Sequence, residues 1–84
     1  MYKVEYHPDV LDDLKRIPKN IQSGLKRAIE ERIAVDPIRF GKSLKGNWAS
    51  CYRLRVANYR IIYEVQQNIC TVLIIKIGTR SDVY

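Results

Sequence analysis

The segment from Cys51 to Val65, CYRLRVANYRIIYEV, constrains the fold more than any other part of the chain. Its apolar residues alternate with other residues on both sides of Ala57-Asn58, and an alternation of period two is typical of half-buried strands. If Ala57-Asn58 is a two-residue turn, Arg55 lies directly opposite Arg60 on the neighbouring strand. The predicted β-hairpin separates two sets of side chains, Arg53, Arg55 and Arg60 on one face and Tyr52, Leu54, Tyr59, Ile61 and Tyr63 on the other.

Periodicity predicts the elements that surround this hairpin. Two stretches have apolar residues at helical spacing, and prolines mark where each helix starts or stops. The last apolar run is rich in β-branched residues, which favour a strand. The predicted elements are a strand at Tyr2–Tyr6, a helix from Pro8 to near Pro18, a helix over Ile21–Ile33, a loop at Pro37–Ser50, a turn at Gln66–Asn68 and a strand at Ile69–Gly78.

Together these elements predict an α+β fold. An N-terminal strand and a helical hairpin precede a three-stranded antiparallel meander, and the helices pack with their apolar faces on one side of the sheet. The other side of the sheet stays open. The 84 residues suit one small domain spanning 1–84, because no repeat or low-complexity segment marks a boundary.

Charge is distributed unevenly along the chain. Residues 1–36 carry seven cations and seven carboxylates, whereas residues 37–84 carry eight cations and only Glu64 and Asp82 as carboxylates. The second part therefore holds the whole net charge of +6. A one-sided excess of Lys and Arg favours a polyanionic partner.

Other classes of protein fit the sequence poorly. The start MYKVEYHPDV lacks the apolar core of a signal peptide, and no apolar run approaches the roughly 20 residues that span a bilayer, so a soluble cytoplasmic protein is expected. Cys51 and Cys70 have no metal-ligand spacing and are interpreted as reduced strand residues, with no metal or other cofactor. His7 is interpreted as a helix cap or surface residue.

The facing arginines admit two interpretations. Solvated charges can keep a sheet soluble, which accounts for one or two cations. A like-charged pair with no carboxylate near it in sequence works against folding and favours a site for an anion. Lys76 and Arg80 share a parity that places them on the same open face.

The motifs of the C-terminal half resemble those of the RelE/ParE toxin superfamily of type II toxin–antitoxin systems. The matching residues are YRLRVANYRIIYEV, preceded by GNW, and the ending IGTRSDVY. The order of strand, helical hairpin and three strands matches over nearly the whole chain. RelE-like members are endoribonucleases that cleave messenger RNA in the ribosomal A site, and ParE-like members act on DNA gyrase. The resemblance implies the RelE-like activity, with gyrase inhibition or non-catalytic binding of RNA or the ribosome as alternatives.

The resemblance also implies roles for particular residues. Arg53 and Arg55 match basic residues that line the scissile phosphate, and Arg60 matches an arginine that stabilises its developing charge. Arg80 matches an arginine near the leaving oxygen, and Tyr84 matches a tyrosine that stacks on or orients a base. Arginine suits phosphate because its planar fork forms paired hydrogen bonds and keeps its charge.

The expected catalytic set contains no obvious general base. Several relatives have lysine in place of Arg53 and Arg55, many have histidine in place of Thr79, and arginine is a poor proton acceptor. Catalysis is therefore expected to rely on positioning and electrostatic stabilisation, with the proton transfers weakly assisted or passed to ribosomal RNA or water. Lys42, Lys45 and Lys76 are expected to bind RNA, and Trp48 is expected to cover an edge of the core.

The resemblance further implies partners. An acidic RelB-like antitoxin, folding as it binds, is expected to cover the cations, and the complex is expected to form higher-order assemblies. The ribosome and messenger RNA are the expected targets. The antitoxin's identity, the codon preference and the group that acts as general base are not specified by the sequence.

Overall fold

The computed structural model describes residues 1–46 and 50–79. No helix among these residues is long and apolar enough to cross a membrane. The regular elements are β1 (Lys3–Tyr6), α1 (Pro8–Lys15), α2 (Lys19–Ala28), α3 (Pro37–Phe40), β2 (Lys42–Ser43), β3 (Cys51–Val56), β4 (Tyr59–Gln66) and β5 (Thr71–Thr79), with a π-helical turn at Ile29–Ile33 and a 3₁₀ turn at Gln67–Ile69.

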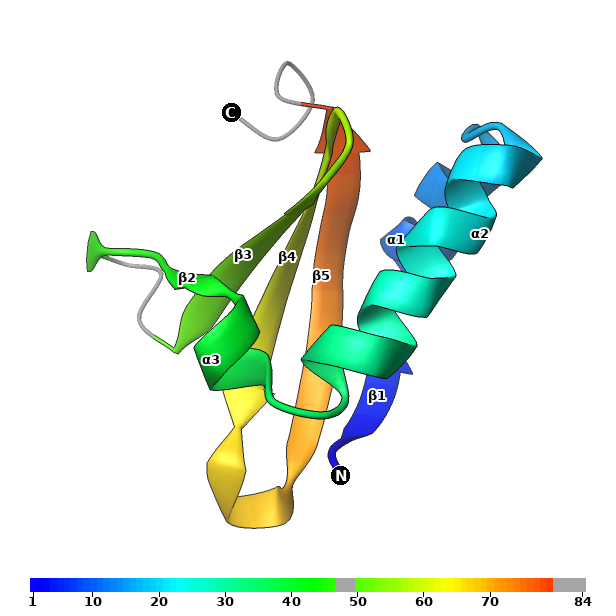
Figure 1. Cartoon of the computed structure of the whole chain (residues 1–84). Coiled ribbons are helices and arrows are strands. Elements are labelled where there is room, and N and C mark those ends of the chain that lie inside the picture. Colours follow the sequence, from blue (N-terminus) through cyan, green and yellow to red (C-terminus); the bar gives the residue numbers. More distant parts are fainter. Residues whose placement is uncertain (47–49, 80–84) are drawn as a thin grey trace.

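One five-stranded sheet organises the structure, in the order β1-β5-β4-β3-β2 (Figure 1). β3, β4 and β5 form the predicted antiparallel meander, and β1 pairs with β5 in parallel. The α+β fold is therefore confirmed. The sheet is wider than predicted, because β2 adds a short antiparallel strand beside β3.

The core lies between the sheet and the helical hairpin. The apolar faces of α1, α2 and the π-helical turn contribute Val10, Leu25 and Ile33, each fully buried. From the sheet, Ile61 of β4 and Ile74 of β5 are also fully buried in the same cluster. The helical spacing and the strand alternation of the sequence thus meet in one shared core.

The two helices are joined by side-chain as well as apolar contacts. The Gln22 side chain of α2 donates hydrogen bonds to the carbonyls of Leu14 and Ile17, at 2.6 and 2.7 Å. Leu14 lies in the last turn of α1, where its carbonyl also accepts the N–H of Ile17 at 3.1 Å, and Ile17 follows the helix. Gln22 thus supplies a donor to the carbonyls at the C-terminal end of α1. At the start of α1, His7 is the N-cap, because its Nδ1 accepts the N–H of Asp9 at 3.1 Å. The predicted capping role of His7 is confirmed.

The segment predicted as a loop contains regular structure. Asp36 caps α3 by accepting the N–H of Arg39 at 3.2 Å, and β2 follows directly. The Tyr63 hydroxyl donates to the Pro37 carbonyl at 2.6 Å, which ties α3 to β4. Burial, with the neighbouring Tyr52 and Asp36, raises the pKa of Tyr63, so the hydroxyl keeps this proton.

The boundaries of β5 differ from the prediction at both ends. Residues Gln67–Ile69 form the 3₁₀ turn, and Cys70 is left-handed with φ 51°, so β5 starts at Thr71. The interpretation of Cys70 as a strand residue is wrong, whereas Cys51 lies in β3. Both thiols are free.

A β-bulge interrupts the pairing of β4 with β5. Ile62 pairs with Lys76 and Tyr63 pairs with Ile74, so Ile75 has no counterpart on β4. The extra residue shifts the alternation of β5, and as a result Ile74 and Ile77 both face the core.

Candidate functional site

The β3–β4 turn determines which side chains share a face. Ala57 has φ 53°, as the first position of a two-residue primed turn requires. Arg55 pairs with Arg60, and Arg53 pairs with Ile62. The predicted register is confirmed. The three arginines alternate with Leu54 and Ile61, which belong to the core under the helical hairpin, so they lie on the opposite face of the sheet. This surface, with Arg53, Arg55 and Arg60, is called the arginine face below.

The arginine face has an apolar centre. Ile62 lies between Arg53 and Lys76 in the sheet, and only 4% of it is exposed. Long cationic side chains can cover such a residue with their stems and keep their charged ends at the surface. Arg53 and Arg60 are half-buried, whereas Arg55 is exposed and its Nε donates to the Ala57 carbonyl at 3.3 Å. Arg55 is therefore anchored at the turn.

The predicted RNA-binding lysines lie in different surroundings. Lys42 pairs with Arg53, so Lys42, Arg53, Ile62 and Lys76 form one row across β2, β3, β4 and β5. Lys42 and Lys45 are exposed. The Lys76 ammonium instead lies 3.2 and 3.3 Å from the two carboxylate oxygens of Asp13 in α1, which neutralises part of its charge.

Three predicted residues fall outside the described part of the chain: Trp48, Arg80 and Tyr84. β5 ends at Thr79, which pairs with Tyr59 next to the β3–β4 turn. Arg80 is the next residue in the sequence.

Few groups near the described arginines can exchange protons at neutral pH. The His7 side chain caps α1, and its backbone N–H donates to the Ile74 carbonyl where β1 ends beside the middle of β5, so the ring is engaged with α1 and not with the arginine face. Glu64 lies on the same sheet face as the arginines, beside Cys51 rather than beside Arg55. Burial, together with Glu64, raises the pKa of the Cys51 thiol, which therefore remains protonated. The described cations thus favour charge stabilisation over proton transfer.

The helical hairpin brings two further ionisable residues close to this site. Asp13 of α1 and Arg16, the C-cap of α1, line a notch of about 310 Å³ beside the last residues of β5. Neither Asp13 nor Arg16 was predicted from the sequence to belong to the site, although a spacing of three residues places both on one side of a helix. The pairing of α1 with β5 joins segments about sixty residues apart, which periodicity does not reveal.

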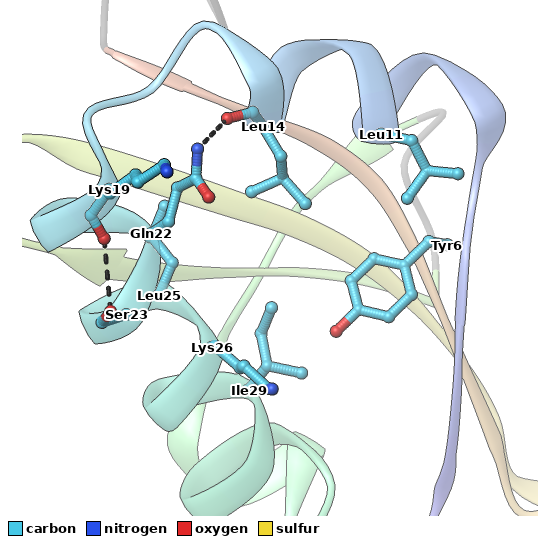
Figure 2. Close-up of a pocket in the computed structure, with 9 residues that line it drawn as sticks. All are labelled: Tyr6, Leu11, Leu14, Lys19, Gln22, Ser23, Leu25, Lys26 and Ile29. Carbon is cyan, nitrogen blue, oxygen red and sulfur yellow. Dashed lines mark hydrogen bonds between the residues drawn. The ribbon is translucent and has the colours of Figure 1, made fainter.

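A larger cleft of about 400 Å³ lies elsewhere, between α1, α2 and β1 (Figure 2). Its lining is mostly apolar and includes Tyr6, Leu11, Leu14 and Ile29. Burial and the nearby Glu30 raise the pKa of the Tyr6 hydroxyl, which stays neutral. Lys19 and Lys26 also line this cleft, but no arginine does. The smaller notch, with Arg16, and the arginine face are therefore the better candidates for paired hydrogen bonds to a phosphate.

Known proteins share this fold and sequence pattern. The family model described as ParE toxin of type II toxin-antitoxin system, parDE, matches residues 4–84. The putative toxin RelE1 of Methanocaldococcus jannaschii is 34% identical over 87 residues, which cover 99% of this chain and 94% of the relative. Toxin RelG of Mycobacterium tuberculosis is 26% identical over 83 residues, covering 99% and 95%. A chain of the toxin–antitoxin complex RelBE2 of M. tuberculosis matches with a TM-score of 0.87 and 25% identity, covering 94% of this chain and 98% of that one.

Proposed function

Because the chain belongs to the ParE toxin family of type II toxin–antitoxin systems and is RelE-like, we propose that it is a ribosome-dependent endoribonuclease. It cleaves messenger RNA in the ribosomal A site and thereby stops translation. The observation that supports this proposal most is the arginine face, which gathers three guanidinium groups on an open sheet surface. Guanidinium groups bind phosphate oxygens through paired, charge-assisted hydrogen bonds.

The proposed reaction is an internal transfer of the phosphodiester. The 2′-oxygen attacks the neighbouring phosphorus and loses its proton, while the bond to the 5′-oxygen breaks and that oxygen gains a proton. The products are a 2′,3′-cyclic phosphate and a 5′-hydroxyl, and the reaction needs no metal. Arg53 and Arg55 line the scissile phosphate, and Arg60 stabilises the charge that develops on the phosphorane.

Two residues beyond β5 complete the proposed site. Arg80 acts near the leaving oxygen, and Tyr84 stacks on or orients a base. Arginine is a poor proton acceptor, the Lys76 ammonium is paired with Asp13, and Lys42 of β2, next to β3, is proposed to bind the RNA backbone. The ribosome therefore supplies the alignment of the 2′-hydroxyl with the leaving oxygen, which a flexible free RNA seldom adopts.

Substitution of Arg60 tests the role of the arginine face. Arg60→Ala is expected to leave a folded protein that no longer arrests growth, since losing one preorganised charge costs about 2–4 kcal/mol of transition-state stabilisation. Arg80→Ala is expected to behave in the same way. Arg27→Ala is the matched control, because Arg27 lies on α2 and pairs with Glu31 at 3.4 Å. Growth arrest by Arg60→Ala equal to that of the wild type, at equal expression, would contradict the proposed site.

The partner in the resting cell is proposed to be an acidic antitoxin. RelBE2 of M. tuberculosis is a toxin–antitoxin complex of a similar chain, and the exposed Lys42, Lys45 and Arg55 suit an acidic segment that folds on binding. The antitoxin is expected to be encoded beside this protein. Coexpression of the two is expected to restore growth and to yield a copurified complex of higher order. Failure of any such protein to copurify, together with harmless expression of the toxin alone, would count against this partner.

Gyrase inhibition is the second candidate, because the matching family model is that of ParE toxins. This activity does not require Arg53, Arg55 and Arg60 to act together on a phosphate. A supercoiling assay with purified DNA gyrase distinguishes the candidates. Inhibition that survives Arg60→Ala would favour the ParE-like activity.

A further inference from the structure

The notch beside β5 adjoins the arginine face. β1 pairs with β5 only as far as Ile74, and α1 lies beside the rest of β5 (Figure 1). The notch remains between α1 and this part of β5, and it has a volume of about 310 Å³. Gly78 lines the notch and is also the strand partner of Arg60. Tyr59 and Ile77 line the notch from the side of the sheet that carries the helical hairpin, whereas Lys76 and Gly78 belong by register to the arginine face. The notch and the arginine face therefore lie on opposite sides of the sheet and meet at the edge of β5.

The lining of the notch combines cationic and aromatic groups. Asp13 is paired with Lys76 at 3.2 Å, and Arg16, the C-cap of α1, is an exposed cation in this lining. Tyr59, half-buried, lines the notch from β4. A guanidinium can bind a phosphate with two parallel hydrogen bonds, and an aromatic ring can stack on a base. The volume lies at the small end of ligand pockets, which start at about 300 Å³.

We propose that the notch is a subsite for the single-stranded RNA nucleotide next to the scissile phosphate. Arg16 binds the phosphate of this nucleotide, and Tyr59 stacks on its base. The Lys76–Asp13 pair holds the wall of the notch between α1 and β5. This inference rests on the proposed endoribonuclease function, and it requires the RNA to pass around the edge of β5, from Arg60 on the arginine face to Tyr59 in the notch.

A comparison of two neighbouring cations tests the subsite. Lys15 and Arg16 are consecutive at the end of α1, yet Lys15 does not line the notch and its side chain is 79% exposed near Asp12. Arg16→Ala and Lys15→Ala therefore change the net charge equally, but only the first alters the notch. With messenger RNA held in purified ribosomes, Arg16→Ala is expected to lower the single-turnover cleavage rate about tenfold, as for one lost charge-assisted hydrogen bond. Lys15→Ala is expected to cleave at the wild-type rate, and Arg16→Lys at an intermediate rate.

A photo-crosslink provides a readout that does not depend on cleavage. The probe is a message with 2′-deoxyribose at the cleaved nucleotide and 4-thiouridine at each neighbouring position in turn, bound to the ribosome with the wild-type protein. The crosslinked peptide is expected to contain Arg16 or Tyr59 for one of these positions, and the crosslink is expected to weaken in Arg16→Ala but not in Lys15→Ala.

The outcomes separate this inference from the proposed function. No cleavage by the wild-type protein would overturn both. Cleavage by the wild type, with Arg16→Ala equal to Lys15→Ala and with crosslinks only to other peptides, would overturn the subsite and leave the endoribonuclease intact. Unchanged thermal unfolding of Arg16→Ala is the control that excludes misfolding. If Arg16→Ala does not fold, the crosslinks of the wild-type protein test the subsite: crosslinks to the peptide with Arg16 or Tyr59 support it, and crosslinks only to other peptides overturn it.

Discussion

Arg55 and Arg60 face each other across adjacent strands, an arrangement that costs free energy when no anion lies near. Like charges directly opposite each other in a sheet destabilise it. Both side chains are long enough to bend apart, and the Arg55 Nε is drawn toward the Ala57 carbonyl. This bending relieves part of the repulsion in the free protein, and a phosphate bound between the guanidinium groups offsets the rest because it attracts both cations.

Removing the charge of Arg55 is expected to raise the stability of the protein and to lower its activity. Arg55→Gln should raise the free energy of unfolding by about 0.2–1 kcal/mol, because it removes the repulsion from Arg60. The gain should shrink at high salt, which screens exposed charges. The same variant should cleave ribosome-bound RNA more slowly. Urea unfolding at two salt concentrations measures the first effect.

Arg27→Gln is the matched control for this prediction, because the Arg27 guanidinium faces Glu31 rather than another cation. It should show no stabilisation. A stability of Arg55→Gln below that of the wild type at low salt would contradict the account of the arginine pair.

For individual residues, the sequence predicted the arginine face well, because strand alternation and a two-residue turn depend on residues close together in the sequence. Arg53, Arg55 and Arg60 lie on the predicted side of the sheet, and His7 caps α1. The pairing of Lys76 with Asp13 was not predictable, because it depends on how α1 packs against β5.

Among the elements, α1 and α2 are held together by one polar side chain in addition to their apolar contacts. Gln22→Ala should lower the free energy of unfolding by about 1–3 kcal/mol, because it leaves the Leu14 and Ile17 carbonyls without this donor. Ser23→Ala is a close control, since the Ser23 hydroxyl donates only to Lys19 of its own helix, at 3.2 Å (Figure 2). Equal unfolding midpoints for the two variants in urea would contradict the role given to Gln22.

Two glycines give opposite predictions for an added methyl group. A Cβ on Gly41 would lie 2.8 Å from Tyr63 Cζ and 3.0 Å from Tyr52 Cβ, where the two rings stack at 5.9 Å. Gly41→Ala should therefore destabilise the protein by about 1–3 kcal/mol. A Cβ on Gly24 meets nothing within 4 Å, and Gly24→Ala should stabilise α2 by about 0.5–1 kcal/mol. Thermal unfolding of both variants measures the contrast, and a shift of the same sign in both would refute it.

Helices and strands were predictable where the helical or the strand periodicity of apolar residues continues without interruption. The helices and the meander were found for this reason, whereas β2 has only two residues and α3 only four. The bulge at Ile75 was also missed, because a run of β-branched residues gives no local sign of where the alternation shifts. These missed elements position Lys42 and Lys76.

Over the described part of the molecule, one face of the sheet gathers five cations of the basic half, with two of them next to the β3–β4 turn: Lys42, Arg53, Arg55, Arg60 and Lys76. The carboxylates of that face, Glu5 and Glu64, lie opposite Leu73 at the other end. A polyanion approaching this face is therefore steered toward Arg55 and Arg60. The uneven charge of the sequence predicted a polyanionic partner, and the fold shows how the charges of distant segments add up on one surface.

Primer extension on one defined message, free in solution or bound to purified translating ribosomes, tests the central proposal most directly. We expect new 5′-hydroxyl ends within the A-site codon of the ribosome-bound message, and slow or absent cleavage of the free message. With Arg60→Ala, the new ends are expected to disappear. Rapid cleavage of free RNA would mean that a general base operates in the protein. An intact ribosome-bound message, with DNA gyrase inhibited by the same preparation, would contradict the endoribonuclease function.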